Sequence, residues 1–429
     1  MTEAKKSFSI ISLGCPKNLV DSEYICEKLS GAGFTMVNET GESDVVIVNT
    51  CAFLQSSVRE SIDTMLEWLD RGKEVVCTGC IVSRYGKNLK REFPEIKVFA
   101  GPGTYDKLPR MIMEGDECAK PLFGSVTART FTSTRGYAYV KISEGCSNHC
   151  SYCLIPSLRG ELVSKPEALV IEECGNLIKK GARELILIGQ DLGGYGKERG
   201  VKDALPGLVK KLSALDRDVW IRLMYIHPAS LTRRLVETIM ENPNVCRYVD
   251  IPVQHISGSV LEKMGRKGGK NAVERSLAML DDAGIWIRST LMVGHPGEDE
   301  KAFSELVGLV DSGIFGSMGA FVYSPEAGTE SAAMTQIEET VKKGRLKKIM
   351  SMQKKVSRKR LKTLIGRTEK VLVEGFHPET GLLLKGRTQF QAPDVDGMTM
   401  INEGSAPFGD FAKVELIRST DYDLIGRIV

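Results

Sequence analysis

Cys146, Cys150 and Cys153 lie within the single short segment CSNHCSYC. Three thiolates this close together can bind three irons of a [4Fe-4S] cluster and leave its fourth iron open. A zinc site would favour paired CxxC units and four ligands, and only His149 stands nearby as a further ligand, so zinc is disfavoured. Chance spacing of small buried side chains is the plain alternative. Because the segment directly follows a predicted strand, a cluster is favoured.

An open iron at such a cluster can be chelated by the amine and carboxylate of an amino acid. S-adenosylmethionine would then lie beside an electron donor. One-electron reduction breaks a carbon–sulfur bond of this cofactor and yields a radical that can remove hydrogen from an unactivated carbon. The three cysteines therefore predict a radical enzyme that uses S-adenosylmethionine.

Three further cysteines each follow a predicted strand: Cys15 in SLGC, Cys51 in VNTC and Cys80 in CTGC. Sites in open parallel sheets form outside the carboxyl ends of the strands, so we expect these residues to meet there. Taken singly, each could merely line a strand end. Taken together, they favour a second cluster with an open position. The other cysteines are interpreted as core or surface thiols: Cys26, Cys77, Cys118, Cys174 and Cys246.

Four other residues are candidates for contact with S-adenosylmethionine. Tyr152 could stack on the adenine, although packing within its own loop is equally compatible. Gln190 and Gln254 each end a predicted strand, where an amide can bond a ribose hydroxyl or a carboxylate, or satisfy a neighbouring loop. Gly294 in GHPGE could let the backbone approach the cofactor, and a turn between strand and helix is the simpler alternative.

The pattern of strands and helices predicts an α/β protein. Up to about residue 120, β-branched runs alternate with helical patterns, which is typical of an open parallel sheet. About six strand–helix units beginning near Gly136 then predict a partial (β/α) barrel. Short β-rich runs after residue 366 predict a small antiparallel barrel. The expected strands of the first two parts are 8–13, 44–49, 74–78, 137–142, 184–188, 219–224, 248–253, 286–292 and 319–323.

We divide the chain into domains 1–124, 132–364 and 365–429, with the Ser/Thr/Arg-rich stretch 125–135 as a linker. The second domain ends in a helical pattern over 337–364 that contains 11 Lys or Arg and two Glu, and so carries a charge of +9. Such a helix either grips RNA phosphates or presents a solvated face. The last domain has a net charge of −3, which suits a basic protein partner better than RNA.

Composition indicates an ordinary globular protein of 429 residues. Its 58 basic and 55 acidic side chains leave a net charge of +3, which gives no overall attraction to nucleic acid or to a membrane surface. No apolar run approaches the roughly 20 residues that span a bilayer, and the first residues resemble no export signal. We therefore expect a cytoplasmic protein whose 11 cysteines are metal ligands or free thiols.

Over nearly the whole chain, these residues resemble the methylthiotransferase branch of the radical S-adenosylmethionine enzymes. SLGCPKNLVDSE at 12–23, IPSLRG at 155–160 and YSPEAGT at 323–329 are similar to the members that modify an aspartate of a ribosomal protein. Members that modify tRNA usually read GCQMN, VPYTRG and YSxRPGT there. One departure is Gly193-Gly194, where relatives more often carry Ser, Thr or Asn before the tyrosine.

The resemblance implies two [4Fe-4S] clusters, an auxiliary one on Cys15, Cys51 and Cys80 and a radical one in the CSNHCSYC segment. It implies an amino-terminal methylthiotransferase domain, a radical barrel and a carboxy-terminal TRAM domain. One S-adenosylmethionine would methylate sulfur on the auxiliary cluster, and a second would form the radical that opens the β-carbon of an aspartate. The product would be 3-methylthioaspartate on a small-subunit ribosomal protein, free or within the ribosome. A flavodoxin or ferredoxin would be a suitable low-potential electron donor.

Two other functions compete with this one. A tRNA adenosine 2-methylthiotransferase would use the same chemistry on an adenosine beside the anticodon. A non-catalytic iron–sulfur protein that binds RNA or ribosomes would hold clusters without cleaving S-adenosylmethionine.

Overall fold

The computed structural model describes residues 6–114, 129–130 and 136–429. The chain forms two compact units, of which the first comprises 1–132, 139–147 and 154–176 and the second the remainder. Most of the predicted linker 125–135, and also Cys118, lie outside the described residues. Within the described ranges, no helix combines the length and apolar character needed to cross a membrane. The division into three domains stays a prediction.

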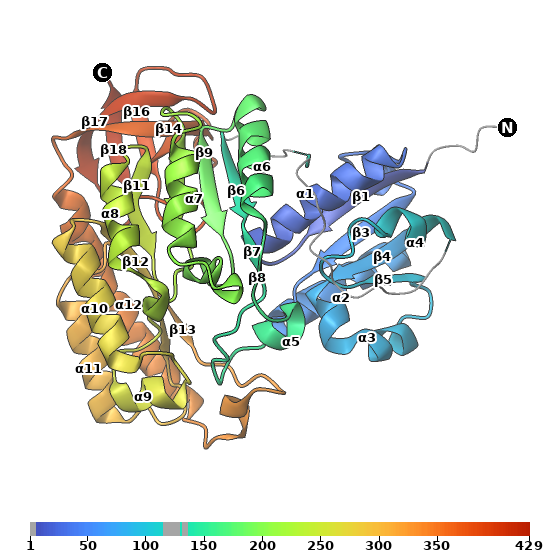
Figure 1. The fold of residues 1–429 in the computed structure, drawn as a ribbon, viewed down its shortest axis with the longest axis horizontal. Helices are drawn as coiled ribbons and strands as arrows, with labels where there is room; N and C mark the ends of the chain where they lie inside the picture. Colours follow the sequence, from blue (N-terminus) through green and yellow to red (C-terminus); the bar gives the residue numbers. More distant parts are fainter. Residues whose placement is uncertain (1–5, 115–128, 131–135) are drawn as a thin grey trace. The chain divides into compact units, whose positions relative to one another are not determined.

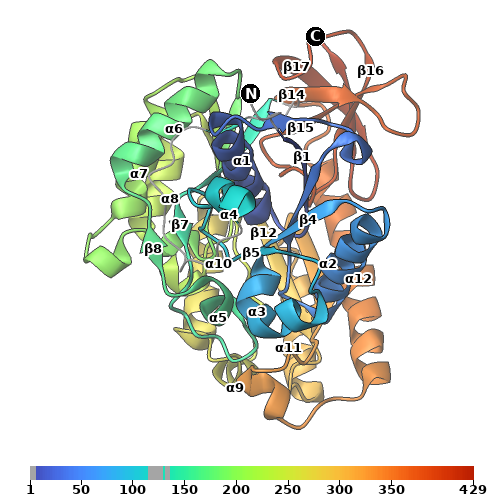
Figure 2. The ribbon, with the colours of Figure 1, turned by 90° about the vertical axis from the view of Figure 1, so that its right-hand side faces the viewer.

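A five-stranded parallel sheet in the order β2-β1-β3-β4-β5 forms the core of the first unit. Helices α2 and α3 pack on one of its faces, where Trp68 and Ile81 meet alternate side chains of the central strands (Figure 2). The central strand VVIVNT is buried along its whole length, as expected for a parallel sheet covered on both faces. The elements are β1 (Ser7–Ser12), α1 (Pro16–Gly31), β2 (Thr35–Met36), η1 (Thr40–Glu42), β3 (Val45–Thr50), α2 (Gln55–Asp70), β4 (Glu74–Gly79), α3 (Cys80–Glu92), β5 (Val98–Ala100), α4 (Leu108–Glu114), β7 (Ser143–Glu144), α5 (Ile155–Arg159) and β8 (Val163–Ser164).

The second unit contains the predicted partial barrel, with strand order β13-β12-β11-β10-β9-β6. Figure 1 shows α7, α8, α10, α11 and α12 along the outside of this sheet. β6 (Tyr137–Lys141) and α6 (Glu167–Lys179) each continue from one unit into the other. The other elements are β9 (Glu184–Ile188), η2 (Leu192–Gly194), η3 (Lys197–Arg199), α7 (Ala204–Ser213), β10 (Trp220–Leu223), η4 (Pro228–Ser230), α8 (Arg233–Glu241), β11 (Val245–Asp250), α9 (Gly258–Lys263), α10 (Gly269–Asp282), β12 (Trp286–Val293), α11 (Glu300–Asp311), β13 (Ser317–Val322), η5 (Glu330–Ala333) and α12 (Glu339–Lys362).

One barrel strand is displaced from its expected position. We expected a strand over 248–253, whereas β11 begins at Val245 and ends at Asp250. Its early end is explained by Pro252, which has no backbone N–H to continue the ladder. The other five strands of the series lie within two residues of their expected bounds.

The end of the chain closes into a five-stranded barrel in the order β14-β15-β16-β18-β17. We expected an antiparallel barrel, but β16 and β18 pair in parallel. The reason is that β17 and β18 form a hairpin, which brings β18 back beside β16 in the same direction. The strands are β14 (Thr368–Phe376), β15 (Leu384–Thr388), β16 (Thr399–Glu403), β17 (Phe411–Ser419) and β18 (Leu424–Ile428).

Aromatic and charged side chains join this small barrel to the larger sheet within the second unit. Trp220 packs on Phe411 with 4.6 Å between the ring centroids. Glu184, fully buried on β9, accepts hydrogen bonds from Arg222 and from Arg387 of the small barrel, both at 2.6 Å. Tyr248 and Asp396 add a hydrogen bond of 2.6 Å across the same seam.

Candidate functional site

Cys15, Cys51 and Cys80 stand at the carboxyl ends of three adjacent strands. Cys15 caps α1, Cys51 follows β3, and Cys80 is the first residue of α3 after β4. A Cβ on Gly14, whose φ is +86°, would lie 2.9 Å from the Cys51 sulfur, so the chain before Cys15 passes directly over Cys51. The pKa of Cys80 is raised to about 11, mainly by burial and to a lesser extent by the nearby thiols of Cys15 and Cys51. The structure thus brings together the three residues that we expected to meet.

Two buried asparagines fix the strand ends that carry these cysteines. The side-chain amide of Asn18 donates to the carbonyls of Leu13 at 2.8 Å and Thr50 at 2.9 Å. Asn49 in turn donates to the Asn18 carbonyl at 2.8 Å. Since backbone carbonyls at strand ends lack ladder partners, these bonds both satisfy them and hold the two loops in register.

Arg159 places a positive charge against this group of thiols. Its Nε donates to the sulfur of Cys80 at 3.3 Å, and the same guanidinium also bonds Asn18 and Asp21. Arg159 is itself buried, and the charge of its guanidinium opposes the effect of burial on the pKa of Cys80. A cation in this position stabilises a thiolate over a thiol.

The donor set fits an iron–sulfur cluster. Three thiols from three strand ends, with a cation beside one of them, are the soft ligands that iron–sulfur clusters use. Among the residues that the structure describes, no three His, Cys, Asp or Glu side chains cluster around the position of a single metal ion. Ligation by Cys15, Cys51 and Cys80 stays a prediction.

The CSNHCSYC segment passes from the first unit into the second. In the first unit, the Cys146 N–H donates to the Gly160 carbonyl at 3.0 Å. A Cβ on Gly145 would lie 2.1 Å from the carbonyl oxygen of Glu161, so only glycine fits before Cys146. In the second unit, the Cys153 N–H donates to the Cys150 carbonyl at 3.0 Å. All three cysteines of the segment are partly exposed.

Hydrogen bonds to other residues of the second unit fix the part of this segment that belongs to that unit. Ser151 donates from its N–H to the Met264 carbonyl at 3.0 Å and shares a hydrogen bond of 2.7 Å with the hydroxyl of Ser331. Nε2 of His295 lies 2.9 Å from the same Ser331 hydroxyl. Burial lowers the pKa of His295 to about 4, so the ring is neutral at pH 7. The loop after β12 therefore positions the backbone between Cys150 and Cys153.

The four residues predicted to contact S-adenosylmethionine lie at the carboxyl ends of strands or in the cysteine segment. Tyr152 is edge-on to His295, with 6.2 Å between ring centroids, and its hydroxyl accepts from Arg266 at 3.4 Å. Gln190 follows β9, and Gln254 follows β11 in a left-handed conformation, with φ 68°. A Cβ on Gly294 would lie 2.3 Å from Cγ of a lysine on α12, which by itself explains the glycine. Contact of these four residues with the cofactor stays a prediction.

Two polar residues that we had not singled out lie at the same strand ends. Asp191, after β9, accepts from the N–H of His227 at 3.1 Å, from Ser230 at 2.8 Å and from Asn148 at 3.0 Å. His227 itself follows β10. A Cβ on Gly193 would lie 2.6 Å from Cβ of Ser230, so only glycine fits at this position. The signal available in the sequence was a His-Pro pair shortly after a strand.

Comparisons with protein families divide the chain into three matches. Residues 7–101 match the uncharacterized protein family UPF0004. Residues 140–310 match the Radical SAM superfamily, and residues 365–429 match the TRAM domain.

Full-length relatives share one description. The ribosomal protein uS12 methylthiotransferase RimO of Geobacter sulfurreducens is 42% identical and is covered over 100% of both chains. The protein of the same name from Bdellovibrio bacteriovorus is 38% identical, covering 100% of this chain and 98% of the relative. Among solved structures, the radical S-adenosylmethionine methyltransferase TsrM of Kitasatospora setae matches with a TM-score of 0.59 and 15% identity, over 77% of this chain and 75% of that one. This last likeness concerns the fold alone.

Proposed function

The chain belongs to the RimO family of ribosomal protein uS12 methylthiotransferases, and from this premise we propose that it converts an aspartate of uS12 to 3-methylthioaspartate. The reaction replaces a C–H bond at the β-carbon by C–S–CH₃. The observation that carries the proposal is 42% identity to a named uS12 methylthiotransferase over the whole of both chains. A ribosomal substrate also supports a cytoplasmic location.

Two [4Fe-4S] clusters and S-adenosylmethionine would supply the chemistry. Cys15, Cys51 and Cys80 would hold the auxiliary cluster, and the CSNHCSYC segment the radical cluster. When bound, the radical cluster and S-adenosylmethionine provide the one-electron cleavage that removes hydrogen from an unactivated carbon. A low-potential flavodoxin or ferredoxin would supply the electrons.

The protein's own side chains orient these groups. Arg159 donates to the Cys80 sulfur at 3.3 Å and so balances the negative charge of a ligating thiolate. In the other unit, Nη1 of Arg266 lies 3.9 Å from the sulfur of Cys150. Neutral His295, through Ser331, holds the backbone of the cysteine segment in place.

Charge favours a protein substrate over tRNA. The TRAM region carries 7 basic and 10 acidic residues, and Glu379 and Glu403 are exposed on it. Ribosomal proteins are basic, so the net negative charge of this region would attract uS12 and repel RNA phosphates.

The basic helix α12 offers less free charge to RNA than its sequence indicates. Arg345 is buried and pairs with Glu298 at 2.8 Å. Lys354 and Arg358 both pair with Asp421, at 2.9 and 3.0 Å. Part of the charge of this helix therefore serves to attach it to the rest of the second unit.

The test is an anaerobic assay with reconstituted enzyme, dithionite and S-adenosylmethionine, offered either uS12 or tRNA. We expect a gain of roughly 46 Da on one aspartate-containing peptide of uS12, with release of 5′-deoxyadenosine. The same gain on a nucleoside would assign the chain to the tRNA enzymes. Cluster binding without any cleavage would support the non-catalytic alternative.

A further inference from the structure

The imidazole of His227 is held in one tautomer by the turn that follows it. Its Nδ1 accepts a hydrogen bond of 3.1 Å from the backbone N–H of Ala229, so Nδ1 carries no hydrogen. In a neutral imidazole the proton must then be on Nε2. Burial, followed by the charge of Arg266, lowers the pKa of His227 to about 3, so the ring is neutral at pH 7. His227 therefore presents a single N–H donor, at Nε2.

This donor is buried and unused. His227 is only 6% exposed, and its Nε2 has no hydrogen-bond partner among the described residues. A buried donor without a partner destabilises the fold, so such a group calls for an acceptor from outside the described residues. The Nε of Arg266 is likewise buried without a partner in the described part of the chain. Two donors in one region thus lack acceptors.

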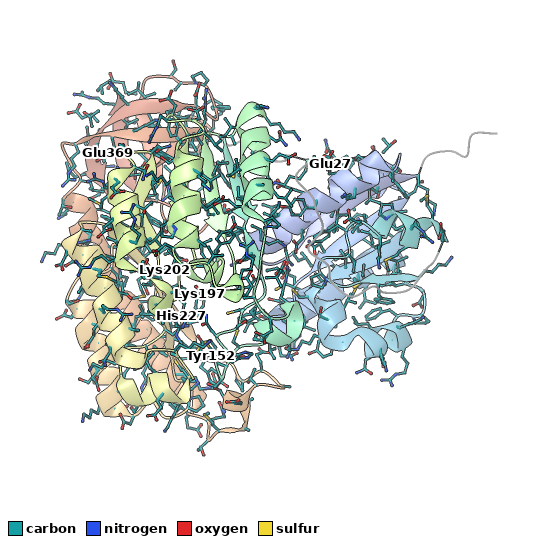
Figure 3. The ribbon with its side chains drawn as sticks, viewed as in Figure 1. Glu27, Tyr152, Lys197, Lys202, His227 and Glu369 are labelled. Atoms are coloured by element: carbon teal, nitrogen blue, oxygen red, sulfur yellow. The ribbon has the colours of Figure 1, made fainter. Side chains whose placement is uncertain are left out.

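The surroundings of His227 are positively charged. The charges of Arg266, Lys197 and Lys267 all lower the pKa of its imidazole. Among the groups with the largest effects on this pKa, Asp191 is the carboxylate, and it raises the pKa. Asp191 already accepts three hydrogen bonds, including one from the N–H of His227. Lys197 reaches this turn by donating to Ser230 at 2.8 Å. Figure 3 shows His227, Lys197 and Tyr152 in the same part of the second unit.

A carboxylate faces the corresponding nitrogen of a second histidine in this unit. His255, after β11, accepts at Nδ1 from the N–H of Ser257 at 3.0 Å, so it has the same tautomer as His227. Its Nε2 lies 3.2 Å from a carboxylate oxygen of Glu298, without the geometry of a hydrogen bond, and both side chains are fully buried. A carboxylate thus faces Nε2 of His255, whereas the described residues place no hydrogen-bond acceptor at Nε2 of His227.

We propose that Nε2–H of His227, with Lys197 and Arg266, binds the carboxylate of a ligand at the carboxyl end of β10. Two sources of that carboxylate are available to this enzyme: the methionine moiety of S-adenosylmethionine and the side chain of the substrate aspartate. The second source rests on the function proposed above. In either case His227 is a positioning residue that orients a reactant and takes no part in bond breaking.

The variants His227→Asn and His227→Gln distinguish loss of the Nε2–H donor from disruption of the fold. Asparagine can accept from the Ala229 N–H but has no group at the place of Nε2. Glutamine can place an amide donor near that position. Both are reconstituted anaerobically, and the cluster absorbance confirms that each protein is loaded. Dissociation constants are then measured by equilibrium dialysis for S-adenosylmethionine and its decarboxylated analogue, and for uS12 with aspartate or asparagine at the modified position.

We expect His227→Asn to weaken binding of one carboxylate ligand by about 10- to 100-fold and to leave binding of the counterpart that lacks this carboxylate unaffected. His227→Gln should recover most of that loss. If only the affinity for S-adenosylmethionine falls, the cofactor is the ligand of His227. If only the affinity for uS12 falls, the substrate is the ligand. Equal affinities of His227→Asn and wild type for all four ligands would overturn the proposal, and so would a glutamine variant as weak as the asparagine variant.

A variant of an exposed residue tests the same site without replacing the buried histidine. Lys197→Gln should weaken the same ligand in the same direction by a smaller factor. Lys202→Gln, an exposed lysine a few residues further along the chain, is the matched control and should have no effect. Equal effects of the two lysine variants would reduce the result to general surface charge and contradict the proposal. These measurements report binding and not turnover. A result that contradicts the role of His227 is therefore compatible with modification of uS12 by the wild type, and the two proposals can be tested separately.

Discussion

Arg159 and Cys80 are 79 positions apart in the sequence, yet the guanidinium Nε of Arg159 donates to the Cys80 sulfur at 3.3 Å. The arginine ends the short helix α5, which packs on α3 within the first unit. Asp21 fixes it from the other side, accepting from Nη1 at 2.8 Å. A buried cation is thereby set against one thiol of the proposed auxiliary cluster.

Removal of this charge should shift the reduction potential of the auxiliary cluster. In a Cys146→Ala, Cys150→Ala, Cys153→Ala background, where only that cluster can form, we expect Arg159→Gln to make the potential more negative. The reason is that a nearby cation stabilises the reduced, more negative cluster. An EPR-monitored redox titration measures the change.

Two further variants control this experiment. Arg159→Lys keeps the charge but loses the fork of donors, so its potential should lie between the other two. Arg110→Gln removes an exposed charge that pairs with Glu114 on its own helix, and should leave the potential unchanged. An unaltered potential in Arg159→Gln would show that the arginine acts only on the fold.

Replacement of each set of three cysteines should have a different effect on the reaction. The triple alanine variant of Cys146, Cys150 and Cys153 should bind about four irons instead of about eight and produce no 5′-deoxyadenosine. The triple variant at the auxiliary site should also bind about four irons, cleave S-adenosylmethionine and transfer no methylthio group. Iron analysis and product mass spectrometry distinguish them. If the first variant still formed 5′-deoxyadenosine, the assignment of the radical cluster would be wrong.

Much of the architecture could be predicted from local pattern. The fully apolar run Val45 to Val48 indicates a buried parallel strand without reference to the rest of the chain. Because parallel strands end at one edge of a sheet, a cysteine after each of three strands was enough to predict that Cys15, Cys51 and Cys80 meet.

The features that could not be predicted depend on contacts between distant segments. Arg159 lies in IPSLRG, a segment with no charge partner of its own, and its role follows only from the packing of α5 on α3. His227 is one of five histidines in the sequence, and its tautomer depends on a backbone N–H two residues later. The parallel pairing of β16 with β18 depends on barrel closure, which no local pattern encodes.

Glu184 should make the seam between the larger sheet and the TRAM barrel sensitive to acid. Burial alone would raise the pKa of this carboxyl, but Arg222 and Arg387 outweigh burial and lower it. A carboxyl whose pKa is lower in the folded protein contributes its full stabilisation of the fold at pH values above the pKa of the unfolded chain, which is about 4.3. This stabilisation is lost as the pH falls through the pKa of the folded protein. Glu184→Gln should therefore lower the free energy of unfolding by about 3–5 kcal/mol at pH 7 and by less in acid.

Urea unfolding at several pH values measures this effect. The matched control is Glu415→Gln, which breaks the partly exposed pair with Arg427 at 2.8 Å and should cost under about 1 kcal/mol. Equal losses in the two variants, or a loss in Glu184→Gln that is the same at every pH, would contradict the prediction.

Reversal of charge on the TRAM barrel should weaken the association with uS12. Glu379→Lys with Glu403→Lys changes two exposed residues, so the fold should be unaffected. Since charges at the rim of an interface act mainly on encounter, we expect a slower association rate and a flatter dependence on salt, with little change in dissociation. The control is Asp281→Lys with Asp282→Lys, two exposed acids at the end of α10 that change net charge equally. Stopped-flow association with labelled uS12 compares the two double variants. Equal slowing in both would mean that net charge, and not the position of the charges on the TRAM barrel, governs the encounter.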